Sequence, residues 1–437
     1  MHQMRRISAL FVCLVVAPST AVAGPLDPPV GPVASTAKPL AEIEPRIAIN
    51  AANTPGDADS LFKIPQPGSY YLTGNITGVA MKIGIEIASS NVSIDLRGFA
   101  VVGVAASLDG IATSIMDPKG VEVRNGSISS WGGDGLDLGV TDAVATGALV
   151  ERIRSFSNTG RGILPGFSAR IVDCTAVQNG GSGIFAFSNC TISGCNASGN
   201  GGDGIEGQRG CTFSNCNVWS NTGRGIDSTG ASVIQGCTAT ASGEQGLFGA
   251  SGSIITGSSA RGNTGTGITG AIGVTITGCS AYQNLGGGFS LSTSGTISAC
   301  TAYDNTGVGI LVSNGSSVIG CTARQNTTHG IQLAGSSLAL NNSCALNGDG
   351  DDGAGILVNG ADNRLEGNNC VGADRGIEVS AAGNIIVRNT CSSNTSNWEI
   401  AASNKCLVVS GVNAGAISGN SGGVSPGSTD PNANFSY

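Results

Sequence analysis

The sequence predicts an all-β solenoid built from stacked coils of 21 residues. The main observation is a glycine followed by a large apolar residue, which recurs every 21 residues from Gly162 to Gly330. A fixed period of this size is typical of proteins in which each repeat buries its apolar face only against neighbouring repeats. The second observation is that 70 of the 437 residues are glycine, far more than helix interiors tolerate.

Within one coil, apolar residues stand at fixed offsets from the glycine. In the coil that begins at Gly225 they are Ile226, Ile234, Cys237 and Ala239, and neighbouring coils repeat the same types. The cysteine and alanine columns are two residues apart, so both point the same way on a strand, while the Ser, Thr or Asn between them faces outward. This alternation predicts short strands with an apolar inner face and a polar outer face.

Bends are expected between these strands, at columns of glycine and asparagine, because both residues tolerate the left-handed backbone that a sharp turn needs. Strands of successive coils lie about 4.8 Å apart, so stacked asparagine side chains are expected to bond amide to amide. This asparagine column comprises Asn158, Asn179, Asn200, Asn221, Ser242, Asn263, Asn284, Asn305 and Asn326.

The Gly-Ile coils, the interior Ile, Cys and Ala stacks and the asparagine column resemble the right-handed parallel β-helix of several families. These are the pectate lyases, the polygalacturonases, the alginate epimerases and the periplasmic copper-site maturation protein of nitrous oxide reductase. The resemblance covers about residues 84–406 and implies a right-handed parallel β-helix, in agreement with the handedness of parallel crossovers. Both ends are expected to be capped, because exposed strand edges recruit other chains. These features specify the fold and do not pick out one family.

The chain is expected to divide into four parts. Residues 1–23 have the features of a signal peptide, with Arg5 and Arg6 before a short apolar core and a cleavage site at 21–23. Residues 24–60 hold half of the fourteen prolines and are expected to be an extended linker. Residues 61–410 form the β-helix domain with its N-terminal cap, and residues 411–437 form a C-terminal tail or cap. This organisation predicts a secreted, periplasmic or cell-surface protein without membrane insertion.

Charge and composition limit the partners. The net charge is −8, which excludes nucleic acid because phosphate contacts need a basic face. Charged residues are only 11% of the chain, so the surface is expected to be mostly Ser, Thr, Asn and Gly. Such a surface suits sugar contacts, and it is also the ordinary surface of a β-helix. The sequence does not fix the oligomeric state.

Thirteen cysteines follow the signal segment. In-register neighbours lie about 4.8 Å apart, wider than the ~3.8 Å between Cβ atoms that a disulfide prefers. We therefore expect reduced thiols that fill the core, with pairing of Cys190 and Cys211 left open. The cysteine column is expected to continue through Cys344, Cys370 and Cys391.

One candidate site lies on the outward column that follows each Gly-Ile pair. Glu206 and Asp227 are consecutive there and are expected about 5 Å apart. The column before each glycine adds acidic and basic residues to the same patch. The candidate residues are Arg161, Phe185, Asp203, Glu206, Arg224, Asp227 and Phe248.

The resemblance to pectate lyases implies roles for these residues. In such enzymes outer carboxylates bind calcium and a basic residue removes the proton next to a uronate carboxyl. By this resemblance Arg224, Glu206 and Asp227 are catalytic candidates, with Arg224 or Arg161 as the base. Asp203 joins the two acids as a calcium ligand. Phe185, Phe248 and Arg161 are the matching substrate contacts. The alternative is a solvated face with a surface pair between Asp203 and Arg224, which stabilises little.

A second candidate site combines His329 with Asp351 and Asp352. Polygalacturonases use a paired-Asp motif and a His-Gly motif, and this chain has Asp351-Asp352 and His329-Gly330. The order is reversed, and the other motifs of that family are missing. The acidic segment is equally consistent with a solvated bulge or a calcium loop.

Two functions follow. The first is an exported β-helix protein that binds or processes an acidic extracellular polysaccharide, with Ca²⁺ as the candidate cofactor. Its activity, if the protein is an enzyme, would be that of a polysaccharide lyase or a glycoside hydrolase. The alternative is a non-catalytic surface, structural or adhesion protein. A cleft formed by long loops of the first coils over the Glu206–Asp227 face would favour the enzyme.

Overall fold

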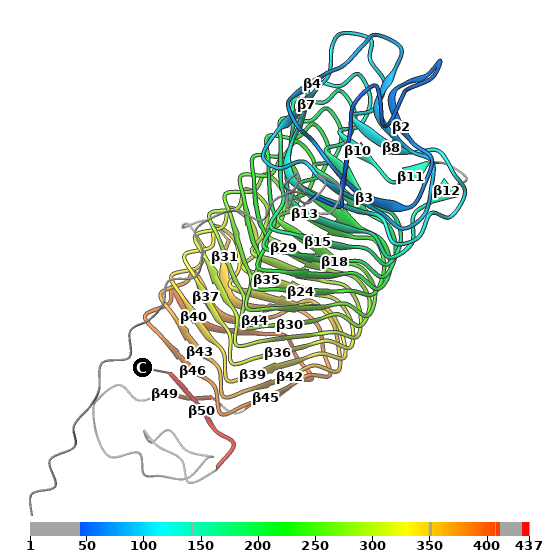
Figure 1. Cartoon of the computed structure of the whole chain (residues 1–437). Helices are drawn as coiled ribbons and strands as arrows, with labels where there is room; N and C mark the ends of the chain where they lie inside the picture. The colour runs from blue at the N-terminus through cyan, green and yellow to red at the C-terminus, as the bar shows by residue number, and fades with distance from the viewer. Residues whose placement is uncertain (1–43, 141–142, 349–351, 407, 411–430, 437) are drawn as a thin grey trace, which may run out of the picture. The chain divides into compact units, whose positions relative to one another are not determined.

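The computed structural model describes residues 44–140, 143–348, 352–406, 408–410 and 431–436. The expected signal peptide, most of the expected linker and Asp351 lie outside the described residues. Residues from Arg46 onward belong to one compact unit, in which every regular element among the described residues is a β-strand. Figure 1 shows the coils of this unit stacked from the strands around β2 to those around β46. No helix in the described ranges is long and apolar enough to cross a membrane.

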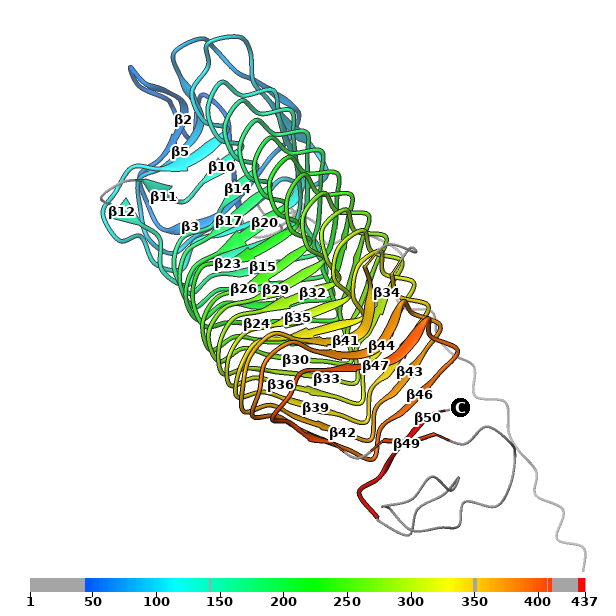
Figure 2. The ribbon, with the colours of Figure 1, turned by 180° about the vertical axis from the view of Figure 1, so that it is seen from behind.

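Each regular coil contributes three strands, and each strand pairs in parallel with its equivalents in the coils before and after. One strand per coil joins a sheet that has 16 strands among the described residues, and Figure 2 shows several of them from behind. The 16-stranded sheet consists of β2 (Ser60–Ile64), β5 (Ile83–Ile87), β8 (Ile111–Thr113), β10 (Leu136–Asp137), β14 (Ile163–Leu164), β17 (Ile184–Ala186), β20 (Ile205–Gly207), β23 (Ile226–Ser228), β26 (Leu247–Gly249), β29 (Ile268–Gly270), β32 (Phe289–Leu291), β35 (Ile310–Val312), β38 (Ile331–Leu333), β41 (Ala354–Val358), β44 (Arg375–Val379) and β47 (Ser396–Ile400).

The other two strands of each coil form two series within a second sheet, which has 32 strands in the part of the chain that the structure describes. The first series is β1 (Ile47–Ala48), β3 (Gly68–Tyr71), β6 (Val92–Asp95), β9 (Glu122–Ser129), β13 (Leu149–Phe156), β15 (Arg170–Val172), β18 (Thr191–Ser193), β21 (Thr212–Ser214), β24 (Val233–Gln235), β27 (Ile254–Thr256), β30 (Thr275–Thr277), β33 (Thr296–Ser298), β36 (Ser317–Ile319), β39 (Leu338–Leu340), β42 (Arg364–Glu366), β45 (Ile385–Val387) and β48 (Lys405–Cys406). The second series is β4 (Ile76–Thr77), β7 (Ala100–Val102), β16 (Thr175–Val177), β19 (Asn196–Ser198), β22 (Asn217–Trp219), β25 (Thr238–Thr240), β28 (Ser259–Arg261), β31 (Ser280–Tyr282), β34 (Thr301–Tyr303), β37 (Thr322–Arg324), β40 (Ser343–Ala345), β43 (Asn369–Val371), β46 (Thr390–Ser392), β49 (Val408–Ser410) and β50 (Asn434–Ser436). The long strands β9 and β13 pair with members of both series.

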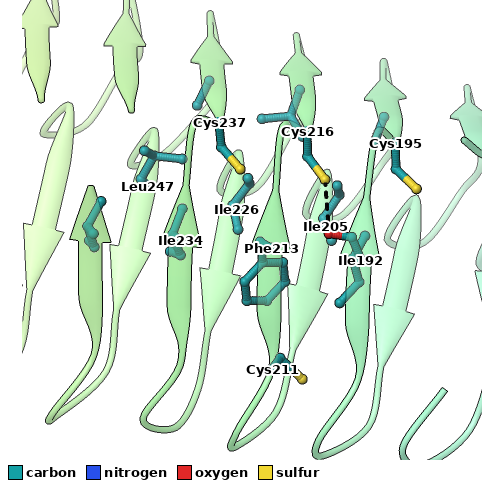
Figure 3. Packing of buried hydrophobic residues seen from close by; sticks show 14 of the residues in the cluster. Ile192, Cys195, Ile205, Cys211, Phe213, Cys216, Ile226, Ile234, Cys237 and Leu247 are labelled. Atoms are coloured by element: carbon teal, nitrogen blue, oxygen red, sulfur yellow. Dashed lines mark hydrogen bonds between the residues drawn. The ribbon is translucent and has the colours of Figure 1, made fainter. Parts of the chain in front are cut away.

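The register confirms the 21-residue columns. Ile205 pairs with Ile226, and Ala239 pairs with Ala260. The inward side chains are buried completely or nearly so, as Ile226, Ile234 and Cys237 illustrate with exposures of 0 to 1%. Figure 3 shows Cys195, Cys216 and Cys237 on successive coils, each in the same place on its coil. Because each coil buries such residues only against its neighbours, the apolar stacks supply the main stabilisation of the solenoid.

The corners of the coil are held by side chains that bond to the main chain of adjacent coils. Asn221 is typical: its Oδ1 accepts the backbone N–H of Asn200 at 3.1 Å and the side-chain N–H of Asn200 at 2.9 Å. Its Nδ2 donates to the carbonyl of Ala197 at 3.0 Å. The predicted amide-to-amide ladder is therefore confirmed, and it satisfies main-chain groups that would otherwise be buried without partners.

The cysteine column occupies a second corner of the same kind, where sulfur replaces the amide. The backbone N–H of Cys279 donates to Sγ of Cys300 at 3.4 Å, and the thiol of Cys300 donates to the carbonyl of Ile276 at 3.7 Å. The thirteen cysteines that the structure describes are all free thiols.

The expected continuation of this column through Cys344, Cys370 and Cys391 is wrong. Cys344 pairs with Ala323, so these three cysteines continue the alanine column. After Cys321, asparagine occupies the corner position that cysteine occupies in the earlier coils. Its side chain forms stronger hydrogen bonds than a thiol. The asparagines in question are Asn342, Asn368, Asn389 and Asn434.

The N-terminal end differs from the expected boundary. Strand β1 pairs in parallel with β3, and Ile49 and Thr54 are buried, so the predicted linker is wrong from Arg46 onward. The proline content favoured a linker, but Pro45 and Pro55 flank these residues and do not interrupt strand β1. At the other end β50 pairs with β46 and β49, and residues 411–430 lie outside the described ranges.

Candidate functional site

The candidate site occupies the outer face of the 16-stranded sheet at β17, β20, β23 and β26. Phe185 pairs with Glu206, Glu206 with Asp227, and Asp227 with Phe248. The four side chains therefore follow one another on consecutive coils, with both acids between the two aromatic rings. The structure thus brings these predicted residues together.

Arg224 is the centre of this group. One guanidinium nitrogen lies 2.9 Å from Oδ2 of Asp227, and Nε donates to Oε1 of Gln245 at 3.0 Å. Nε also lies 3.6 Å from a carboxylate oxygen of Glu244. The guanidinium carbon stands 4.3 Å from the ring centre of Phe248, which is a cation–π contact. Arg224 is therefore fixed in place by two carboxylates, an amide and a ring.

The same arginine–aromatic unit occurs three coils earlier. Arg161 lies over Phe185, with its guanidinium carbon 4.5 Å from the ring centre. The two arginines and the two phenylalanines are each 63 residues apart, which is three coils or about 14 Å. The outer face thus presents one contact unit twice, at a fixed spacing along the coils.

Asp203 has a different role from the predicted ones. Its Oδ1 accepts the backbone N–H of Arg224 at 2.6 Å. Asp109 and Asp134 do the same for the residue one coil later, at 2.7 Å to Asp134 and 2.5 Å to Arg161. Carboxylates in this column therefore join successive coils. Where a surface ion pair between Asp203 and Arg224 was expected, Asp203 instead accepts a hydrogen bond from the main chain of Arg224.

Burial perturbs the acids of this face. It raises the pKa of Glu206, and the nearby charges of Asp203 and Asp227 raise it further. Burial also raises the pKa of Asp227, which the neighbouring Arg224 partly offsets. Oδ1 of Asp227 is buried without a hydrogen-bond partner. These carboxyl groups therefore hold protons more readily than exposed acids, and Asp227 keeps one unsatisfied acceptor.

The predicted calcium site is not preformed. Among the described residues, the one group of three acidic, His or Cys ligands within 4.8 Å of one another is Asp57, Asp59 and Glu86. There Lys63 already pairs with Asp57 at 2.7 Å and with Glu86 at 2.8 Å. The expected calcium ligands are engaged elsewhere, Asp203 by a backbone N–H and Asp227 by Arg224.

The second predicted site is only partly described. Nδ1 of His329 accepts the backbone N–H of Ala354 at 3.0 Å, and burial lowers the pKa of His329. Asp352 is exposed and pairs with Arg375, while Asp351 lies outside the described residues. Nδ1 of His329 thus joins two coils through a hydrogen bond to the main chain, as Oδ1 of Asp203 does.

Sequence reasoning missed a short antiparallel hairpin beside the first arginine–aromatic unit. It consists of β11 (Gly139–Val140) and β12 (Ala143–Val144), and it accounts for extra residues in a long coil. A Cβ atom added at Gly139 would lie 2.8 Å from the ring of Phe187, whose centre is 5.4 Å from that of Phe185. The base of the hairpin therefore reaches the aromatic cluster at Phe185.

Asp137 lies at the base of this hairpin, where its Oδ1 accepts the backbone N–H of Gly139 at 2.7 Å. Burial raises the pKa of Asp137 to about 6, and the charges of Asp109 and Asp134 contribute. Its place in the same outward column as Glu206 was the signal available in the sequence. Its hydrogen bond to the base of the hairpin could not be foreseen.

Comparison with known proteins bears on the fold. Residues 204–347 match the family model described as a right handed beta helix region. No curated protein matches the sequence.

Several solved structures are similar at low identity. The A-module of the Azotobacter vinelandii mannuronan C-5 epimerase AlgE4 is 13% identical, with 78% of this chain and 90% of that chain covered and a TM-score of 0.41. The periplasmic alginate epimerase AlgG is 13% identical, with coverages of 82% and 79% and a TM-score of 0.30. A tailspike protein of E. coli bacteriophage HK620, in complex with a pentasaccharide, is 12% identical, with coverages of 78% and 70% and a TM-score of 0.34.

All three TM-scores lie below 0.5, so the assignment of the fold rests on the matched family model and on the coils themselves. The parallel pairing, the 21-residue register and the asparagine ladder agree with that model. The chain therefore folds as a right-handed parallel β-helix, and residues 204–347 carry the match to that family model.

Proposed function

We propose that the protein binds an acidic polysaccharide on the outer face of its 16-stranded sheet. The observation that carries the proposal is the repeated unit in which Arg161 lies over Phe185 and Arg224 lies over Phe248. A polysaccharide presents the same chemical groups at regular intervals, and a repeated contact unit along the coils suits such a ligand. Arginine donates in a planar fork that matches a carboxylate.

The residues between the two units suit sugar hydroxyl groups. Glu206 lies between them, and Ser182 donates to its Oε2 at 3.3 Å. With the pKa of Glu206 raised by burial, its carboxyl group can accept a hydrogen bond or, when protonated, donate one. The unpaired Oδ1 of Asp227 is a further acceptor for a hydroxyl group of the ligand.

The geometry favours binding over turnover. A lyase reaction would need Arg224 or Arg161 to act as the base. Asp227 and Glu244 both stabilise the charged form of Arg224, and Asp134 lies 4.0 Å from the guanidinium of Arg161. Binding also needs no calcium in this proposal, because the arginines supply the positive charge that meets the ligand carboxylates. The proposed protein is thus a polysaccharide-binding surface protein. Its export rests on the features of residues 1–23, and we infer a mature chain that begins at Gly24.

The test is calorimetric titration with oligogalacturonate and oligomannuronate, with a neutral cello-oligosaccharide as the comparison. Arg161→Gln and Phe248→Ala are expected to weaken binding of the acidic ligands about tenfold. Arg209→Gln is the matched control, since it removes the same charge from an exposed turn outside the strands of the 16-stranded sheet. Equal affinity for all three variants and the original chain would reject the proposed face.

A second assay separates binding from processing. Ultraviolet absorbance of unsaturated products is followed with pectate and alginate, with calcium and with a chelator. The proposal predicts no product in either condition and unchanged binding with the chelator. Calcium-dependent product that is lost in Glu206→Gln would show that this face is a lyase site instead.

A further inference from the structure

A second surface carries a distinct chemical pattern, on the outer face of the 32-stranded sheet. It is formed by the end of β13 and by the three-residue strands β16, β19, β22, β25, β28, β31, β34 and β37. In each of these three-residue strands the middle residue is buried and the outer two face outward. The face therefore consists of two parallel columns of outward side chains.

The two columns differ in kind. The first is almost entirely hydroxyl and amide, and it contains Arg154, Thr175, Asn196, Asn217, Thr238, Ser259, Ser280, Thr301 and Thr322. The second, which we name the aromatic column, contains Phe156, Val177, Ser198, Trp219, Thr240, Arg261, Tyr282, Tyr303 and Arg324. The register pairs each residue with the next one in its own column.

Aromatic residues gather in this column although they are rare in the chain. The sequence has 11 Phe, 5 Tyr and 3 Trp in 437 residues, and four of them stand here. Phe156, Trp219 and Tyr303 are 40%, 56% and 39% exposed. Large aromatic side chains left in water along one line are typical of a binding surface.

The aromatic residues also follow the spacing of the first face. Phe156, Trp219 and Tyr282 are each 63 residues apart, and so are Arg261 and Arg324. These intervals equal three coils, or about 14 Å. The column from Phe156 to Arg324 spans eight coils, or about 38 Å, so it can contact several successive units of a chain-like ligand.

The charge of the face is opposite to that of the protein. The charged residues of the two columns are Arg154, Arg261 and Arg324, with no acid among them, although the net charge is −8. Arg261 lies over Tyr282, with its guanidinium carbon 5.2 Å from the ring centre. Within the described residues no ion pair or hydrogen bond holds the guanidinium of Arg154 or Arg324. The face is therefore complementary to an acidic ligand.

The surface is hollowed where the columns begin. A groove of about 330 Å³ is lined by Arg154, Phe156, Thr175 and Gln178, among others. A neighbouring groove of about 380 Å³ shares Arg154 and Thr175 and adds Arg152 and the one acid, Asp173. Arginine, amide, hydroxyl and aromatic groups thus line a depression in which a sugar unit can be held.

We propose that this face is a second polysaccharide-binding surface, on which a chain of acidic sugars lies along the coils. The apolar faces of sugar rings pack on Trp219, Tyr282 and Tyr303, and sugar carboxylates meet the three arginines. Hydroxyl groups of the ligand bond to the neighbouring column of Thr, Ser and Asn. The proposal shares its ligand class with the proposed function but uses none of its residues.

The experiment uses Trp219 as its own probe. The other two tryptophans, Trp131 and Trp398, are buried and half-buried, so a ligand on this face changes mainly the emission of Trp219. Titration of the full chain with hexagalacturonate is expected to shift that emission, and the shift is expected to vanish in Trp219→Phe. Tyr303→Ala and Arg261→Gln are expected to weaken binding about tenfold. Ile254→Ala, an equally exposed apolar residue on the neighbouring series, is the matched control and keeps full affinity.

The outcomes separate this inference from the proposed function. Binding that is lost in Arg161→Gln but kept in Arg261→Gln and Tyr303→Ala overturns the second surface and leaves the first. The reverse result overturns the first surface and supports the second. Equal binding of a neutral hexasaccharide overturns the acidic ligand class. Self-association in the ultracentrifuge that disappears in Trp219→Ala assigns the face to a second copy of the chain and overturns the proposal.

Discussion

The asparagine ladder has one gap, at Ser242. Every other described member from Asn158 to Asn326 offers an amide oxygen to the coil before it, but Oγ of Ser242 is buried without a hydrogen-bond partner. Consequently the backbone N–H of Asn221 lacks the acceptor that Asn200 has at 3.1 Å. Ser242 still donates its own N–H to Asn263 at 2.9 Å, so only one step of the ladder is broken.

A valine stands close to the gap at Ser242. A Cβ atom added at Gly204 would meet Nδ2 of Asn221 at 2.6 Å, whereas one added at Gly225 would meet Cγ2 of Val218 at 2.9 Å. Val218 stands in a column that is otherwise alanine in the adjacent coils. From these distances we infer that the methyl group of Val218 occupies the volume that an asparagine amide would need at position 242.

The test is a double-mutant cycle of Ser242→Asn and Val218→Ala. The asparagine would restore two acceptor bonds and one donor bond, worth about 3 kcal/mol together. Alone it clashes with Val218, and overpacking of ~1–3 kcal/mol cancels most of that gain. Val218→Ala alone loses two buried carbons and costs about 2 kcal/mol. The pair together is expected to be more stable than the original chain by about 1 kcal/mol, with a coupling of about 2–3 kcal/mol.

Guanidinium unfolding of the four proteins measures the coupling, and amide exchange at Asn221 reports the local bond. Exchange of that N–H is expected to slow only in the double variant. If the two changes are additive within ~0.5 kcal/mol, the ladder and the alanine column do not share this volume. The explanation of the gap is then incorrect.

Three further outcomes are expected. Buried core thiols such as Cys216 should react with a thiol reagent only after unfolding; rapid reaction in the folded protein would contradict their burial. Asp137→Asn should stabilise the fold by about 2 kcal/mol near pH 7.5 and hardly at all near pH 3.5. The reason is that the pKa of Asp137 is about 6 in the folded protein and about 3.9 in the unfolded chain. The stability that protonated Asp137 gives is therefore lost as pH rises through 6, and asparagine does not undergo this loss. A constant difference across this range in pH-dependent unfolding would exclude that cause. Asn434→Ala removes acceptor bonds of 2.9 and 3.0 Å to Asn389 and should speed proteolysis at the C-terminal coils but not at the N-terminal ones.

The sequence alone is sufficient to predict the coil, because each repeat touches only the next. A spacing of 21 residues therefore becomes adjacency in space, and the pairing of Glu206 with Asp227 follows directly. The same arithmetic could have found the column of Trp219, Tyr282 and Tyr303. This column lies apart from the residues that flank each Gly-Ile pair, on which the predicted site is built.

Other features depend on contacts that spacing does not encode. A carboxylate before a glycine is equally suited to a guanidinium or to a backbone N–H, and only the geometry shows that Asp203 bonds to the main chain of Arg224. The hairpin after Asp137 lies in a coil of irregular length, where no column predicts its place. Strand β1 has two residues, too few to give a periodic signal.

The central claim is that residues separated by multiples of 21 stand above one another on successive coils. Pulsed electron spin resonance tests it with spin labels on Thr175→Cys paired with Thr301→Cys or with Thr322→Cys, all in one outward column. The account predicts backbone separations of about 29 Å for six coils and about 34 Å for seven. Separations that do not lengthen by about 5 Å with the added coil would contradict it.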